Sequence, residues 1–268
     1  MIRHTPSPVP AEVASALPLP AEDIYGNTKK LRFIIDRLDR HAERIGRPPV
    51  VLDFGCGNAD ALGRYLADGQ RHYYGVDMHD ASLDHARSIC RSSNTTFAKA
   101  IPDGVTFDAL VYADVLEHLH DPTSVLREHV SRLAPGGVVL GSVPNGYGPC
   151  EIEKYLTRHL HLYEIARWPL QMARRLTGRA RPSVPAVPYN HDSGHVVFFT
   201  LGMLDAMAAD AGLTVTRFGH GGFVGADLTG ATIFRSQAFA AWNSRISDQL
   251  PSRMVSTWYF ELARTGTT

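Results

Sequence analysis

The chain has 268 residues, of which 44% are hydrophobic and 20% charged, enough to bury one sizeable core in a globular fold. Lysine plus arginine equals aspartate plus glutamate at 27 each, so the overall charge gives no electrostatic case for a nucleic-acid partner, and none is expected. The three cysteines form no C-x-x-C pair, which argues against a disulfide framework or a structural zinc site and suits a reducing cytoplasm.

The N-terminal segment is rich in proline, which is not typical of the apolar core of a signal peptide. No window of the sequence reaches the length of an apolar membrane-spanning helix. We therefore expect a flexible N-terminal arm over residues 1–24 and one domain over residues 25–268.

From residue 28 to about residue 145, apolar strands alternate with amphipathic helices, which is typical of a parallel sheet covered on both faces. A first helix is expected to be capped by Asn27 or Thr28 and to end near Gly46. The next elements are expected as a strand over 50–54, a short helix through 62–66, a strand over 72–77, a helix over 82–90, strands over 95–100 and 107–114, a helix from 122 to 133 and a strand over 138–143.

The alternation changes after Pro144. Residues 146–194 combine a helical pattern with a proline-rich run, and we expect them to form a helical cap inserted over the sheet. The sheet pattern is expected to resume with HVVFFT at 195–200, followed by a helix over 201–211, a strand over 213–218, a looser segment to about 250 and a last strand over 255–263.

The stretch VLDFGCGNAD, residues 51–60, indicates a ligand site at the end of a strand. Gly55 and Gly57 allow a sharp turn that brings backbone N–H groups against a ligand. A dinucleotide fingerprint needs a glycine or alanine where the chain has Asp60, and no phosphate-loop motif is present. Asp53 would repel a pyrophosphate but attract a ligand that carries ammonium and sulfonium groups. The turn therefore favours a cationic ligand.

Asp77 ends the next predicted strand, 24 positions after Asp53. A carboxylate at this place can accept hydrogen bonds from both hydroxyls of a ribose. A ribose joined to a cationic amino-acid tail describes S-adenosylmethionine. The alternative is that Asp53 only caps the turn and that Asp77 is an ordinary acid at a strand end.

Four blocks occur in order along the chain: VLDFGCGNAD, YYGVDMHDASLDHAR, FDALVYADVLEHLHDP and LAPGGVVLGSVPN. Over roughly residues 25–145 the chain thereby resembles the class I S-adenosylmethionine-dependent methyltransferases, in the branch that includes quinone-pathway and sugar or glycan O-methyltransferases. The resemblance implies an α/β fold, a three-layer Rossmann-like sheet of seven strands with the last one antiparallel.

The resemblance also implies which residues bind the cofactor. The glycine turn would line the methionine portion, Asp53 would orient it, Asp77 would bind the ribose and Met78 would pack on the adenine. Lys30 stands where some relatives carry an arginine that reaches the cofactor carboxylate, and Asp114 would lie beside the methyl donor. The full implied set is Lys30, Asp53, Gly55, Cys56, Gly57, Asp77, Met78 and Asp114.

The block ADVLEHLHDP offers a second chemical site. Asp114, Glu117 and His118 are spaced to project to one side of a helical turn. They are candidates to bind a divalent cation such as Mg²⁺ or to supply a base, and quinone-pathway relatives have a comparable acidic-x-x-Glu-His set linked to a metal. The alternative is that Glu117 and His118 only form hydrogen bonds to neighbouring loops.

Methyl transfer mainly requires the acceptor oxygen to be aligned with the methyl–sulfur bond, and a base helps when the acceptor is a hydroxyl. The expected catalytic residues are His118, Asp114 and His195, with His191 as a further candidate. Each histidine has the alternative of a purely structural role.

The insertion is expected to determine the choice of acceptor. Between Glu151 and Arg181 it carries seven lysines and arginines against three glutamates, an excess of four positive charges. This excess suits a phosphorylated or nucleotide-linked acceptor, or peripheral contact of the cap with an anionic membrane. The favoured interpretation is an amphipathic lid whose apolar side covers the active site, because Pro169 interrupts a long interfacial helix.

The sequence therefore predicts a cytoplasmic S-adenosylmethionine-dependent methyltransferase that acts on an oxygen of a small-molecule acceptor. A sugar or glycan precursor is the expected acceptor, and a phenolic or quinone-type molecule is the alternative. Two other classes stay open: a non-catalytic S-adenosylmethionine-binding regulator or partner subunit, and a nicotinamide dehydrogenase, whose third glycine the chain lacks. The sequence does not indicate an oligomeric state.

Overall fold

The computed structural model describes residues 4–10, 12–13, 15, 17–160, 194–225 and 236–266. Its strands are β1 (Val50–Phe54), β2 (His72–Val76), β3 (Thr95–Ala98), β4 (Phe107–Ala113), β5 (Leu133–Pro144), β6 (Leu213–His220) and β7 (Thr257–Arg264). Its α-helices are α1 (Asn27–Ile45), α2 (Gly63–Leu66), α3 (Asp80–Ile89), α4 (Pro122–Val130), α5 (Pro149–His159), α7 (Leu201–Asp210) and α9 (Gln237–Ile246), with short 3₁₀ turns η1 (Leu116–His118), η2 (Ser247–Gln249) and η3 (Ser252–Met254).

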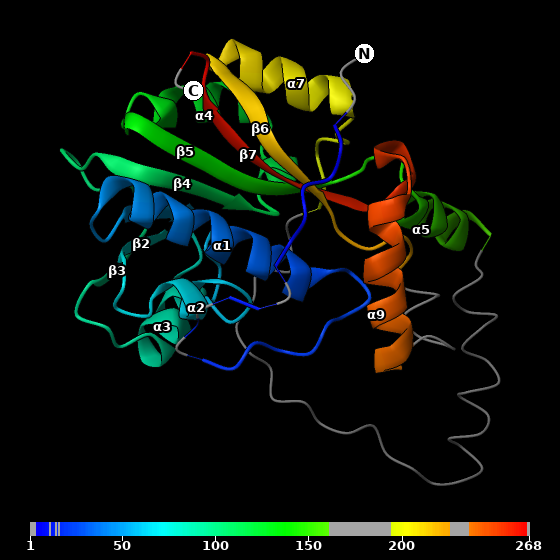
Figure 1. The fold of residues 1–268 in the computed structure, drawn as a ribbon, viewed down its shortest axis with the longest axis horizontal. Coiled ribbons are helices and arrows are strands. Elements are labelled where there is room, and N and C mark those ends of the chain that lie inside the picture. The colour runs from blue at the N-terminus through cyan, green and yellow to red at the C-terminus, as the bar shows by residue number, and fades with distance from the viewer. Residues whose placement is uncertain are drawn as a thin grey trace, which may run out of the picture.

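The strands form one sheet in the order β3-β2-β1-β4-β5-β7-β6 (Figure 1). The pairs from β3 to β5 are parallel, whereas β7 is antiparallel to both of its neighbours. The expected Rossmann-like α/β fold with seven strands and an antiparallel last strand is confirmed. In such a sheet, the carboxyl ends of β1, β2 and β4 lie at one edge, where ligands bind.

Two hydrophobic clusters lie on the two faces of the sheet. Neighbouring residues of a strand alternate between them: Val51 belongs to the cluster under α1, α2 and α3, and Leu52 to the cluster under α4 and α7. Both residues are fully buried, as the near-continuous apolar character of the strand indicates for a parallel sheet covered on both sides.

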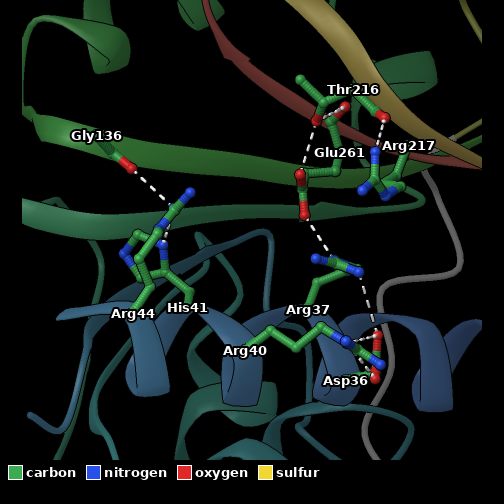
Figure 2. Close-up of polar contacts among 9 residues, drawn as sticks. All are labelled: Asp36, Arg37, Arg40, His41, Arg44, Gly136, Thr216, Arg217 and Glu261. Carbon is green, nitrogen blue, oxygen red and sulfur yellow. Dashed lines mark hydrogen bonds and ion pairs between the residues drawn. The ribbon is translucent and has the colours of Figure 1, made fainter. Parts of the chain in front are cut away.

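Helix α1 is placed almost as the sequence predicts. It begins after Gly26, so neither Asn27 nor Thr28 is its cap, and it ends at Gly46, whose left-handed backbone lets its N–H donate to the Ala42 carbonyl. Polar side chains also join α1 to the sheet. Arg37 donates to Glu261 on β7 at 2.7 Å, and Thr216 on β6 donates to the other oxygen of Glu261 at 2.6 Å (Figure 2).

Two expectations for the C-terminal half are wrong. The segment HVVFFT forms no strand, because its backbone is used elsewhere: the N–H groups of Val196 and Val197 donate to the Glu117 carbonyl at 2.8 and 3.0 Å. The looser segment before residue 250 contains a regular helix, α9, whose cap Ser236 accepts a hydrogen bond from the Phe239 N–H.

The inserted cap is described only in part. Helix α5 follows β5, and the basic residues from Arg167 to Arg181, together with Pro169 and His191, lie outside the described residues. In the N-terminal arm, His4 contacts Asp205 on α7 at 2.7 Å. The division into an arm, a domain and a cap stays a prediction. In the part of the chain that the structure describes, no helix is long and apolar enough to cross a membrane.

Candidate active site

The turn after β1 is held against the end of β2. The N–H groups of Gly55 and Cys56 both donate to the Val76 carbonyl, at 2.7 and 3.0 Å. Gly55 has φ +76°, and a Cβ there would lie 2.4 Å from Cγ2 of Val115, so only glycine fits. Gly57 also has positive φ (+54°), but the space around it is open, and a ligand can approach its backbone closely.

Asp77 joins this turn to the start of helix α3. One carboxylate oxygen accepts the Gly57 N–H at 2.9 Å, and the other accepts the His79 N–H at 2.8 Å. These two bonds fix the direction of the carboxylate, and each oxygen keeps a second lone pair for further donors. The geometry fits the predicted role of Asp77 as an acceptor for two ribose hydroxyls.

Asp53 lies deeper than the turn. It is only 2% exposed and accepts a hydrogen bond of 2.6 Å from the hydroxyl of Tyr73. Burial raises the pKa of Asp53 to about 6, the Tyr73 hydrogen bond opposes that rise, and the neighbouring charge of Asp77 adds to it. Asp53 therefore lies where its charge would act on a cation bound at the turn.

Cys56 lies in the turn and Met78 lies after β2, and their side chains differ in exposure. Cys56 is partly buried, and burial raises the pKa of its thiol well above the usual range, which disfavours a nucleophilic thiolate. The Met78 side chain is 87% exposed after the end of β2, so its packing on an adenine stays a prediction.

Asp114 follows β4 in a left-handed conformation, φ +55°, that is unusual for a residue other than glycine. Its carboxylate accepts hydrogen bonds from Lys30 on α1 and from the Ser142 hydroxyl on β5, the latter at 2.5 Å. Desolvation raises the pKa of Asp114, but Lys30 and Ser142 more than offset this, and the pKa lies below its usual value. Asp114 is thus held ionised at the edge of the site.

Glu117, His118 and His195 form a second cluster, in which one ligand atom from each lies within 4.8 Å of the others. Glu117 is 1% exposed, and no hydrogen-bond partner of its Oε2 is found among the described residues. Burial, with the nearby charge of Asp114, raises the pKa of Glu117 to about 8. An unpartnered buried carboxylate oxygen beside two imidazoles fits the ligands that a divalent cation accepts.

His118 and His195 are joined to each other and to the cap. Their ring centroids lie 5.1 Å apart, and the His118 Nδ1 contacts the Gly194 carbonyl at 3.1 Å. The His195 Nδ1 lies 3.7 Å from Oε1 of Glu151 on α5, which also receives the Lys154 ammonium at 2.6 Å. Burial and the Lys154 charge lower the pKa of His195, which favours the neutral imidazole that a general base requires.

A cleft of about 650 Å³ opens between α5 and the segment that contains His195. Its described lining is mainly aromatic and aliphatic, with a polar end at Glu151, Lys154 and His195: Gly146, Tyr147, Glu151, Ile152, Lys154, Tyr155, Leu156, His159, Gly194, His195 and Phe198. An apolar cleft with a few converging polar groups is the usual form of a small-molecule site.

The structure brings together most of the predicted site residues. Asp53, Asp77 and the residues of the glycine turn lie at the ends of β1 and β2. Lys30 donates a hydrogen bond to Asp114. Among the described residues, Glu117 and His118 form a cluster with His195, and Lys30 and Ser142 bind Asp114. The charge of Asp114 still acts on Glu117, and the predicted metal set of Asp114, Glu117 and His118 stays a prediction.

Several residues of the site were not predicted. Ser142 donates a hydrogen bond to Asp114, and Tyr73 donates one to Asp53. Glu151 lies beside His195. Tyr73 on β2 lies diagonally opposite Asp53 on β1. This neighbourhood follows from the register of the two strands, which the sequence alone does not reveal.

A family model described as a methyltransferase domain matches residues 27–217 of the chain. Among curated proteins, the chain is 28% identical over 170 residues to the ubiquinone biosynthesis O-methyltransferase of Neisseria meningitidis serogroup A, a match that covers 58% of this chain and 66% of that protein. It is 33% identical over 119 residues to the protein of the same name from Chromobacterium violaceum, covering 41% and 50%. The chain thus spans about half to two thirds of the length of these relatives.

Solved structures share the fold at low identity. A S-adenosylmethionine-dependent methyltransferase from Mesorhizobium loti matches with a TM-score of 0.51 at 14% identity, over 85% of this chain and 96% of that one. A putative methyltransferase from Haloferax volcanii, solved with its activator, matches with a TM-score of 0.50 at 16% identity, over 90% and 95%.

Proposed function

The chain belongs to the methyltransferase-domain family, and on this premise we propose that it transfers the methyl group of S-adenosylmethionine to a hydroxyl oxygen of a phenolic or quinone-type small molecule. Family membership supports the donor and the type of reaction. The named relatives, which are ubiquinone biosynthesis O-methyltransferases, support a phenolic acceptor better than the sugar or glycan precursor that the sequence predicts.

The observation that carries the proposal is the pair of carboxylates at the ends of β1 and β2. Asp77 is fixed by two backbone N–H groups and suits a ribose, while Asp53 lies buried behind the glycine turn and suits a cation. When bound, S-adenosylmethionine would supply an electrophilic methyl group on a sulfonium. The chain would hold the ribose with Asp77, place the methionine portion along Gly55 to Gly57 and meet its charged end with Lys30 and Asp114.

The acceptor would lie in the cleft beside α5, with its hydroxyl toward His195 and His118. Either histidine, held by contacts to Glu151 or Gly194, would accept the proton that the hydroxyl loses as the methyl arrives. The apolar walls would exclude water from the reacting oxygen, which favours transfer to the acceptor over side reactions.

The alternative to a histidine base is a divalent-cation site at Glu117, His118 and His195, because an imidazole nitrogen that binds a cation cannot also accept the proton. Bound there, a cation such as Mg²⁺ would lower the pKa of an acceptor hydroxyl. Removal of metal with a chelator, followed by addition of single divalent cations, is expected to lower and restore turnover if this site is used. Two results together would remove the cation from the proposal. Turnover would be unchanged after chelation, and elemental analysis would find the same metal content in wild type and Glu117→Gln.

The decisive experiment uses S-adenosylmethionine with a deuterated methyl group and a panel of phenols, catechols and sugar nucleotides. We expect mass spectrometry to find a labelled methyl ether on a phenolic acceptor, and loss of product with Asp77→Ala. A labelled sugar would reinstate the sugar acceptor. Donor binding without any labelled product would favour a non-catalytic binding protein, for which Ala substitution of Asp114 and His118 would leave function intact.

A cytoplasmic location belongs to the same proposal. The described cysteines, Cys56, Cys90 and Cys150, are all free thiols, which suits a reducing compartment. Fractionation of cells that express the tagged chain is expected to find it with the cytoplasmic proteins, and recovery with the membranes would instead support contact of the cap with lipid.

A further inference from the structure

Tyr73 on β2 and Asp53 on β1 are bonded inside the core, directly behind the glycine turn. Tyr73 is 0% exposed and donates its hydroxyl hydrogen to Oδ2 of Asp53 at 2.6 Å. A short hydrogen bond from a hydroxyl to a carboxylate stabilises the charged form of the acid. The bond therefore acts on the charge of the acid that lies buried behind the turn.

The fold keeps space open for this pair. Val51 pairs with Tyr73 and Asp53 with Gly75 in the parallel register, so Tyr73 and Asp53 are diagonal neighbours on one face. Gly63 on α2 lies over the tyrosine, and a Cβ there would be 2.7 Å from the hydroxyl oxygen. Glycine at position 63 leaves the hydroxyl free to reach the carboxylate.

The charge balance around Asp53 is unfavourable without Tyr73. The acid faces buried apolar residues of β1 and β4, the thiol of Cys56 in the turn and the carboxylate of Asp77 after β2. Burial and Asp77 both oppose its ionisation, and Tyr73 favours it. The methyl donor carries a sulfonium charge that its demethylated by-product, S-adenosylhomocysteine, lacks, so an ionised Asp53 stabilises only the donor in this respect.

We propose that Tyr73 is a positioning residue that keeps Asp53 ionised and thereby sets the preference of the site for cationic S-adenosylmethionine over its uncharged by-product. The inference rests on the proposed use of that donor, and it does not depend on the identity of the acceptor. It assigns to Tyr73 a role in limiting inhibition by the product, since a site that discriminates by charge releases the by-product more readily.

The test measures the dissociation constants of both ligands by calorimetry from pH 5.5 to 9 for wild type, Tyr73→Phe and Asp53→Asn. Loss of the hydrogen bond should raise the pKa of Asp53 by about one to two units. At pH 7 the by-product-to-donor ratio of dissociation constants should therefore fall about two- to tenfold in Tyr73→Phe and return toward the wild-type value at pH 9. In Asp53→Asn the ratio should be low at every pH, and it should change only as the ligands themselves titrate.

Tyr74→Phe is the matched control, because Tyr74 packs against Phe107 on the opposite face of the sheet and should leave the ratio unchanged. Equal loss of both ligands in Tyr73→Phe at every pH, or no change, would overturn the inference. If that variant does not fold, wild type alone decides: relative to Asp53→Asn, its ratio must rise with pH around a midpoint near 6. Failure of wild type to bind either ligand would refute the proposed donor itself, a different outcome from binding with an unchanged ratio.

Discussion

At the scale of single residues, two acids at neighbouring strand ends differ in a way that sequence does not reveal. Asp77 is held by backbone N–H groups at the surface of the turn, whereas Asp53 is buried and, within the described part of the chain, accepts a hydrogen bond from the hydroxyl of Tyr73. Both are aspartates after apolar runs. Their environments, not their type, give them separate tasks, one for hydrogen-bonding hydroxyls and one for meeting a positive charge.

Asp53 should make stability depend on pH. Its folded pKa, about 6, lies above the unfolded value of 3.8, so between these values the unfolded state loses a proton that the folded state retains. The free energy of unfolding should fall by about 3 kcal/mol as pH rises through this window and stay lower above it. Urea unfolding at pH 4 and pH 7 should show this fall in wild type and a smaller one in Asp53→Asn. Equal falls in both would contradict the assigned pKa.

Gly55→Ala should damage both the fold and the site. The new Cβ would meet Val115 at 2.4 Å in a left-handed backbone conformation, which predicts a loss of about 2 to 4 kcal/mol in the free energy of unfolding. Thermal unfolding would measure it. Gly104→Ala provides a control for the backbone effect, since Gly104 also has positive φ (+72°) but open space around it, and its cost should be about 1 kcal/mol.

At the scale of elements, α9 is fastened to α1 by a buried lysine. Lys29, 6% exposed, donates to the Ser244 carbonyl at 2.8 Å and to Asp248 at 2.6 Å. Burial lowers its pKa, and the contact with Asp248 opposes that shift. Such a pair contributes more to the placement of the helix than to net stability.

Lys29→Met should therefore loosen α9 selectively. It keeps the apolar stem but leaves the buried Ser244 carbonyl without this donor, at a cost of about 1 to 3 kcal/mol. Hydrogen exchange should accelerate in α9 more than in α4, which packs on the face of the sheet opposite α1. Uniform acceleration in both helices would show that the lysine stabilises the whole fold. Arg40→Met, at an exposed pair with Asp36, should change little.

Sequence pattern was sufficient for elements whose residues alternate or repeat in a regular way. Strand β1 and helices α1 and α7 lie within a residue or so of their predicted bounds, because burial on a known face determines them. HVVFFT has the composition of a strand, but the Glu117 carbonyl takes its N–H groups, a contact between segments about 80 positions apart in the chain. Likewise, the spacing of Asp114 and Glu117 does not indicate that Lys30 and Ser142 donate hydrogen bonds to Asp114.

At the scale of the whole molecule, the proposed donor should stabilise the fold by mass action. At one hundred times its dissociation constant, a ligand that binds only the folded state adds about 2.7 kcal/mol. For a chain of this size, that corresponds to a rise of about 5 to 10 °C in the midpoint of thermal unfolding. S-adenosylhomocysteine should produce this rise in wild type and not in Asp77→Ala. A rise of the same size in both proteins would place the ligand elsewhere.

The order of the strands has a consequence for how the molecule folds. Among the described strands, β6 pairs only with β7, and β7 lies between β5 and β6 although it comes last. Residues 213–220 must therefore wait for residues 257–264 before they can join the sheet, and closing that long loop is slow. Until then, α7 and β6 expose apolar surface while the half of the sheet that carries the glycine turn can already assemble. A refolding experiment should accordingly show protection of β1, β2 and β4 before that of β6.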